Sequence, residues 1–196
     1  MQKIGITGGI GSGKTTASKV FELLGVPVYY SDEESKQLLY NDETIKEKVV
    51  ALFGNSVLNI LGDIDRKALG TIVFKDKEKL QQLNAILHPA VALHFTEWAK
   101  TKSNENYILK EAAILFESGA NKQVEKVITV SAPEDLKIKR AMHRDTISKE
   151  QVEQRMKNQM SDEEKIKLSQ FVIYNDEEQL LIPQIIKIHK ALIGFQ

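Results

Sequence analysis

The chain has 196 residues, 42% of them hydrophobic, and its 27 lysines and arginines balance 27 aspartates and glutamates. This length and apolar content predict one compact domain with a modest inserted lobe and exclude global disorder. The zero net charge argues against a nucleic-acid partner, and the lack of cysteine excludes disulfides and thiolate metal sites. We find no signal peptide and no apolar run of the ~20 residues that a membrane span needs, so we expect a cytoplasmic protein without a membrane partner.

The first elements are a short strand, a glycine-rich turn and a helix. Residues 3–7 are typical of a buried strand, and residues 8–13 form the turn. The following helix carries apolar residues at i, i+3, i+4 and i+7 spacing, and Gly25 suits the position just after its end. A second strand is expected over residues 26–30.

A long helical stretch follows, over residues 35–102. Ser31 and Glu34 form the S-x-x-E pattern of a capping box at its entry. His88-Pro89 is expected to separate one helix from the next, because proline disfavours helical geometry in the residue before it. Two further helix starts are predicted from N-cap residues, Asp65 and Asp76.

Three more strands are expected, over residues 107–109, 126–130 and 171–174. A second helical stretch, residues 136–168, carries two more capping-box patterns, which begin at Ser148 and Ser161. Strands that alternate with helices indicate a parallel sheet covered on both faces.

We therefore expect an α/β fold with a five-stranded parallel sheet covered by helices, in a single domain. Its core would comprise residues 1–34, 103–135 and 169–196. Insertions at the carboxyl ends of parallel strands build substrate sites, so residues 35–102 are interpreted as a helical acceptor-binding insertion and residues 136–168 as a helical lid.

The segment Gly8-Gly9-Ile10-Gly11-Ser12-Gly13-Lys14-Thr15 matches the phosphate-loop pattern G-x-x-x-x-G-K-[ST] at every fixed position, between a strand and a helix. Its glycines let backbone N–H groups turn around phosphate oxygens. Lys14 is expected to reach the β- and γ-phosphates of ATP, and the Thr15 hydroxyl is expected to bind Mg²⁺. The predicted nucleotide-binding set comprises Gly9, Ile10, Gly11, Ser12, Gly13, Lys14, Thr15 and Thr16. The motifs D-x-x-G and N-K-x-D of GTP-dependent switches are missing, which favours a kinase.

Asp32 follows the second strand at a carboxyl end of the sheet. A carboxylate there can take the proton of an attacking hydroxyl as a general base. The alternative is a charge in the first turn of a helix, where it interacts with the helix dipole. Position alone leaves both interpretations open.

Other charged residues have two interpretations each. Glu111 ends the third strand, where it could hold Mg²⁺ through water or be an ordinary strand-end charge. Arg140 and Arg144 share a helix face and could grip phosphates, or they could be solvated. On the next helix a polar stripe continues at i, i+4 spacing through Gln151, Arg155 and Gln159.

Together these segments resemble the dephospho-CoA kinase family over nearly the whole chain. Residues 5–15 are close to that family's phosphate loop, and Ser31-Asp32 resembles its D-A-D segment. Further similarity lies in five segments: Asp65-Arg66-Lys67-Ala68-Leu69 with Val73-Phe74 (D-R-x-x-L…V-F), Ile86-Leu87-His88-Pro89 (I-x-H-P), Ala113-Ile114-Leu115-Phe116-Glu117 (P-L-L-F-E), the lid from Arg140 to Gln159, and Val172-Ile173-Tyr174-Asn175 (V-I-x-N).

The resemblance implies a P-loop NTPase that transfers a phosphoryl group from ATP, with Mg²⁺, to the ribose 3′-hydroxyl of dephospho-CoA. It implies that Asp32 is the base and that Lys14 and Arg140 act in catalysis. Arg144 and Asn175 would contact ATP, Thr15 and Glu111 the metal, and the substrate contacts would come from Asp32, His88, Glu111 and Leu115. We expect a monomer or a weak homo-oligomer.

The chain departs from the family pattern at three places. Glu111 stands where aspartate is usual, Ala113 replaces proline, and Ser169-Gln170 stands where A-D is common. Two other functions remain open at this point: a kinase of another small acceptor such as a nucleoside or nucleotide, and a P-loop switch protein with slow hydrolysis.

Overall fold

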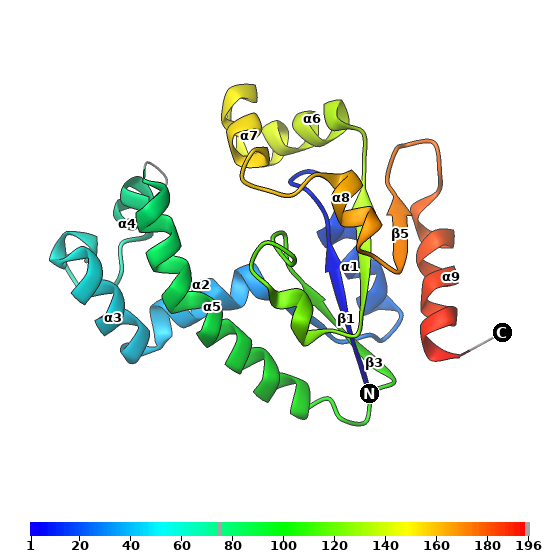
Figure 1. Cartoon of the computed structure of the whole chain (residues 1–196), viewed down its shortest axis with the longest axis horizontal. Helices are drawn as coiled ribbons and strands as arrows, with labels where there is room; N and C mark the ends of the chain where they lie inside the picture. The colour runs from blue at the N-terminus through cyan, green and yellow to red at the C-terminus, as the bar shows by residue number, and fades with distance from the viewer. Residues whose placement is uncertain (74–75, 195–196) are drawn as a thin grey trace. The chain divides into compact units, whose positions relative to one another are not determined.

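The computed structural model describes residues 1–73 and 76–194; Phe74, part of the V-F pair, lies outside the described residues. The chain falls into two compact units, Met1–Tyr30 with Ala99–Gln196, and Ser31–Trp98. The first unit contains the sheet, and the described part of the second is helical (Figure 1).

The sheet is parallel throughout and has five strands in the order β2-β3-β1-β4-β5. This confirms the predicted α/β fold with a five-stranded parallel sheet. The central position of β1 places the turns after β1, β3 and β4 at one edge. The strands are β1 (Gln2–Thr7), β2 (Val28–Tyr30), β3 (Tyr107–Glu111), β4 (Lys126–Ser131) and β5 (Phe171–Tyr174).

The second strand begins later than predicted, at Val28. Pro27 has no N–H to donate to a neighbouring strand. Its carbonyl still accepts a hydrogen bond from the Leu109 N–H at 2.9 Å, so only half of the pairing exists there.

Helices α1 (Lys14–Leu23) and α9 (Leu181–Ile193) cover one face of the sheet. Phe21 of α1 and Ile185 of α9 are fully buried against Ile4 and Ile6 of β1. The segment after β3 covers the other face, where Leu115 packs with Ala112 and Val127.

The predicted lid, residues 136–168, contains most of α6 (Glu134–Asp145) together with α7 (Lys149–Met156) and α8 (Asp162–Lys167). The capping boxes at Ser148 and Ser161 are both formed, as predicted. Helices α6 and α7 lie beyond the carboxyl end of β1 (Figure 1). The predicted polar stripe is wrong at its end: α7 stops at Met156, so Gln159 lies outside the helix.

The second unit packs its own apolar core around Val49, Val57 and Leu83. Asp65 and Asp76 accept hydrogen bonds from first-turn N–H groups, as expected of N-caps. Among the helices of the described residues, none is long and apolar enough to cross a membrane. The unit's elements are α2 (Ser31–Asn41), α3 (Glu43–Phe53), a 3₁₀ turn η1 (Asn55–Val57), α4 (Arg66–Val73) and α5 (Lys77–Lys100), whose last two residues belong to the first unit.

The predicted helix break at His88-Pro89 is wrong. α5 runs through Pro89 without interruption. Buried apolar residues on both sides of the proline, Leu87 and Val91, continue the same helical pattern. Packing of this face outweighs the one backbone hydrogen bond that proline cannot donate.

The predicted capping box at Ser31 is also wrong. Ser31 is itself the first residue of α2, and within the described residues its buried Oγ has no hydrogen-bond partner. Glu34 Oε2 instead lies 3.6 Å from His94 Nδ1. An N-cap residue has a non-helical backbone. Ser31 is already part of the helix, so it does not act as its N-cap.

Candidate active site

The phosphate loop joins β1 to α1, as its sequence predicted. Gly11 and Gly13 have φ values of 77° and 93°, a region that glycine adopts without steric cost. A Cβ on Gly11 would collide with the Lys137 backbone, and one on Gly13 would collide with the Asn175 side chain. Both positions therefore need glycine for two independent reasons.

Helix α1 begins at Lys14, directly after this turn. The N–H groups of Lys14, Thr15 and Thr16 lie in its first turn, where an α-helix offers no carbonyl acceptor. These donors and the helix dipole together make a site for an anion. Thr15 is half-buried and Thr16 is exposed.

Lys14 and Glu111 meet at the carboxyl edge of the sheet. Lys14 Nζ lies 3.3 Å from Glu111 Oε1, and their side chains are only 12% and 5% exposed. The register of the strands explains the meeting, because Glu111 pairs with Ile6 near the end of β1. The predicted phosphate-binding cation and the predicted metal-binding carboxylate therefore share one site.

Arg140 and Asn175 are joined to the loop in a chain of hydrogen bonds. Arg140 Nη1 donates to the Asn175 carbonyl oxygen at 3.0 Å, and Asn175 Nδ2 donates to the Ser12 carbonyl oxygen at 2.8 Å. Arg140 Nη2 also pairs with Glu177 Oε1 at 2.9 Å. The structure thus places both predicted residues beside the phosphate loop.

Arg144 is more exposed than Arg140 and forms an ion pair with Asp145. Its Nε and Nη2 donate to the two carboxylate oxygens at 2.7 and 3.0 Å, and Arg155 Nη1 donates to Oδ2 at 2.9 Å. The hydrogen bond with Arg144, and then the charges of both arginines, lower the pKa of Asp145. The hydrogen bond to Asp145 likewise raises the pKa of Arg144, to which the charge of Glu111 adds a smaller effect.

Asp32 and His88 belong to the second unit. Asp32 is exposed in the first turn of α2, beside Glu33 and Glu34. His88 is half-buried in α5, and burial lowers the pKa of its imidazole. Their roles as base and substrate contact stay predictions.

Leu115, a predicted substrate contact, has no exposed side-chain surface. Its side chain is fully buried in the core. A Cβ on Gly5 would lie 2.6 Å from Leu115 Cδ2, so the side chain fills the space that this glycine leaves. A substrate contact from Leu115 would have to come from its backbone.

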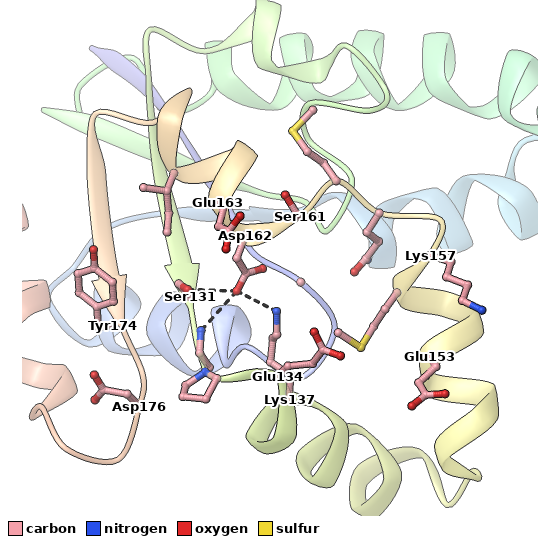
Figure 2. Close-up of a pocket in the computed structure, with 17 residues that line it drawn as sticks. Ser131, Glu134, Lys137, Glu153, Lys157, Ser161, Asp162, Glu163, Tyr174 and Asp176 are labelled. Atoms are coloured by element: carbon pink, nitrogen blue, oxygen red, sulfur yellow. Dashed lines mark hydrogen bonds and ion pairs between the residues drawn. The ribbon is translucent and has the colours of Figure 1, made fainter.

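Sequence reasoning missed a group of buried lysines behind the loop. Lys137 Nζ pairs with Asp162 Oδ2 at 3.0 Å, and Ser131 Oγ donates to the same oxygen at 3.1 Å (Figure 2). Lys165 is fully buried, pairs with Glu117 at 3.2 Å and donates to the Ala113 carbonyl at 3.0 Å. No sequence pattern marks such pairs, because their members are up to 52 residues apart.

A cavity of about 760 Å³ lies against this group and touches the loop at Gly9. Acidic residues project around it from α6, α7, α8 and the β5 end (Figure 2). Its lining includes none of Lys14, Thr15, Glu111 and Arg140, so it meets the predicted phosphate site only at Gly9.

The departures from the family pattern have structural partners. Gln170 Oε1 accepts a hydrogen bond from the Val127 N–H at 2.8 Å. Ser169 Oγ lies 2.7 Å from Thr129 Oγ1. Both residues thus fasten the start of β5 to β4.

Comparisons with known proteins agree with this geometry. The family model described as "Dephospho-CoA kinase" matches residues 2–180. A dephospho-CoA kinase of Bacteroides fragilis is 45% identical over 186 residues, 95% of this chain and 90% of the relative. The structure of a dephospho-CoA kinase from Campylobacter jejuni has a TM-score of 0.73 at 30% identity, covering 99% of this chain and 98% of that one. A shikimate kinase from Acinetobacter baumannii shares the fold, with a TM-score of 0.57 at 18% identity over 99% of this chain and 94% of that one. The chain therefore belongs to the dephospho-CoA kinase family.

Proposed function

We propose that this chain transfers the γ-phosphoryl group of ATP to the ribose 3′-hydroxyl of dephospho-CoA, giving ADP and coenzyme A. The family match over residues 2–180 carries the proposal. The intact phosphate loop, with Lys14 at the start of α1, supports it independently.

Magnesium fits the oxygen donors that the chain offers. Mg²⁺ is usually bound by one or two protein oxygens together with substrate phosphates and water. Thr15 would contribute its hydroxyl, and Glu111 its carboxylate through water. Among the described residues no group of three or more His, Cys, Asp or Glu side chains could hold a metal ion. When bound, the ion neutralises charge on the β- and γ-phosphates.

The chain's own groups have three tasks in the transfer. Lys14 and the first-turn N–H groups of α1 hold the phosphates and spread their charge. Arg140 and Arg144 add cations from α6. The 3′-hydroxyl oxygen of the acceptor attacks the γ-phosphorus, and ADP leaves. Asp32 accepts the proton of that hydroxyl.

Incubation with ATP, Mg²⁺ and a panel of acceptors tests the function. We expect phosphorylation of dephospho-CoA and little of nucleosides, nucleotides or shikimate. Lys14→Ala is the control and should lose transfer. Faster transfer to another acceptor would show that dephospho-CoA is not the substrate. Slow ATP hydrolysis with every acceptor, without transfer, would indicate a switch protein.

Location and assembly complete the proposal. We expect a cytoplasmic protein that is a monomer or weak homo-oligomer and has no nucleic-acid partner. The balance of 27 basic and 27 acidic residues supports the last point. Light scattering after gel filtration, over a range of protein concentrations, tests the assembly.

A further inference from the structure

Ile10, in the middle of the phosphate loop, is held by the lid in two ways. Its side chain is 9% exposed and packs with Ile138 and Ala141 of α6 and Val152 of α7. Its backbone N–H donates to Gln159 Oε1 at 2.9 Å. One loop residue therefore completes the apolar core of the lid and also uses a lid amide as its hydrogen-bond acceptor.

Gln159 is in turn connected to the segment after β3. Its own N–H donates to the Met156 carbonyl at 2.9 Å, and the next N–H, of Met160, donates to Glu117 Oε1 at 2.7 Å. Glu117 pairs with Lys165, which is fully buried and also bonded to the Ala113 carbonyl. The acceptor of the Ile10 N–H thus rests on the segment after β3.

The preceding loop residue, Gly9, lies close to the same region of the chain. A Cβ on Gly9 would lie 3.1 Å from Asp162 Oδ1 and 3.6 Å from Lys137 Nζ. These two side chains form the ion pair seen in Figure 2. Residues 159–165 therefore form a strap that is bonded to the loop at Ile10 and lies close to it at Gly9.

We propose that Gln159 is a positioning residue of the phosphate loop. Its side-chain oxygen takes the Ile10 N–H and so fixes the orientation of that peptide plane. The carbonyl of the same peptide, that of Gly9, accepts a hydrogen bond from the Ser12 N–H at 3.1 Å, so the Gln159 contact also fixes the turn from Gly9 to Ser12. The N–H groups after this turn, at the start of α1, are the ones that would bind the phosphates. The inference rests on the proposed function, since ATP is the ligand of the loop.

The strap is held in place by two other parts of the first unit. The strap is bonded to the sheet segment after β3 and to β4 through Ser131.

The test replaces Gln159 with leucine, which has similar bulk and no acceptor. Gln154→Leu is the matched control, because Gln154 is an exposed glutamine of α7. Calorimetry measures ADP affinity, steady-state kinetics the KM for ATP and kcat, and a melt the stability. Gln159→Leu should weaken ADP binding and raise the KM for ATP by about 3–10-fold, the usual effect of one hydrogen bond, with a smaller change in kcat. Gln154→Leu should match wild type.

Amide exchange reports the hydrogen bond itself. The Ile10 amide should exchange faster in Gln159→Leu and stay protected in Gln159→Glu, which keeps an acceptor oxygen. The Ala17 amide, bonded to the Gly13 carbonyl at 3.0 Å, should keep its protection in all variants.

Two results would overturn the inference. One is a Gln159→Leu variant that melts lower but binds ADP as wild type does, since Gln159 would then only hold the lid. The other is equal loss of ADP affinity in Gln154→Leu. A wild-type protein that binds ADP but does not phosphorylate dephospho-CoA would instead overturn the proposed acceptor, while the ADP affinities still decide the role of Gln159.

Discussion

At the scale of single residues, charged groups of the site form ion pairs with one another. Lys14 lies against Glu111, and Arg140 against Glu177. The first pair is nearly buried, whereas Glu177 is 65% exposed. Exposed ion pairs contribute little to stability, so Arg140 can exchange a carboxylate for a phosphate at small cost.

Arg140→Lys tests whether this arginine acts on phosphate. Lysine keeps the charge but loses the planar fork that binds two acceptors at once. We expect turnover with saturating ATP and dephospho-CoA to fall at least ~10-fold, which corresponds to about 1.4 kcal/mol, with an unchanged melting temperature. Lys139→Ala, an exposed change on the same helix, should have no effect. Normal turnover in both Arg140→Lys and Arg140→Ala would make Arg140 a surface charge.

Asp32→Asn separates a catalytic carboxylate from a helix-dipole charge. The amide cannot accept the hydroxyl proton, so turnover should fall by about 10²–10⁴ while ATP affinity is kept. The lost first-turn charge should cost only about 0.3–1 kcal/mol of stability. Glu33→Gln, in the same turn and also exposed, should lose similar stability and no turnover. Equal turnover in the two variants would show that Asp32 is not the base.

At the scale of elements, sequence reasoning succeeded where local pattern decides the structure. The strand at β5, the phosphate turn and the capping boxes at Ser148 and Ser161 depend on neighbouring residues and were predicted. It failed at Ser31, which joins α2 instead of capping it, and at Pro89, where packing decides. A proline disfavours a continuous helix locally, and the burial of an apolar face overrides this preference.

The continuous helix α5 makes a prediction about Pro89. An alanine there restores the backbone N–H that an α-helix donates to the carbonyl four residues earlier. Pro89→Ala should therefore raise the free energy of unfolding by about 1–3 kcal/mol. Pro133→Ala controls for the entropy of the unfolded chain, because Pro133 is the N-cap of α6 and replaces no helical hydrogen bond. A lower melting temperature for Pro89→Ala than for Pro133→Ala would contradict the argument.

At the scale of the whole molecule, the sequence predicted the α/β class but not which residues from different segments meet. The phosphate loop was visible because its chemistry lies in eight consecutive residues. The contact of Ile10 with Gln159, or of Lys165 with Glu117, depends on strand order and on how the lid packs. Buried lysines are the clearest case, since composition alone assigns lysine to the surface.

Another buried lysine, Lys110, should shape the pH dependence of global stability. Lys110 is 2% exposed in the middle of the sheet, and its Nζ donates to Gln123 Oε1 at 2.6 Å. Burial lowers its pKa from 10.5 to about 8. Between these values the unfolded chain binds more protons than the folded chain, so stability rises with pH in this window and is flat below it. The rise from this group is at most about 3 kcal/mol.

Urea unfolding at pH 7, 8, 9 and 10 measures this effect when wild type is compared with Lys110→Met. Methionine fills the same space without a charge that must be desolvated. Its stability relative to wild type should therefore be greatest at pH 7 and fall steadily above pH 8, as wild-type Lys110 loses its proton in the folded state. The comparison cancels the similar contribution of Lys165, whose pKa burial also lowers. Lys19→Met, at an exposed position of α1, should track wild type at every pH. A constant difference between Lys110→Met and wild type over the whole range would show that Lys110 stays charged in the fold.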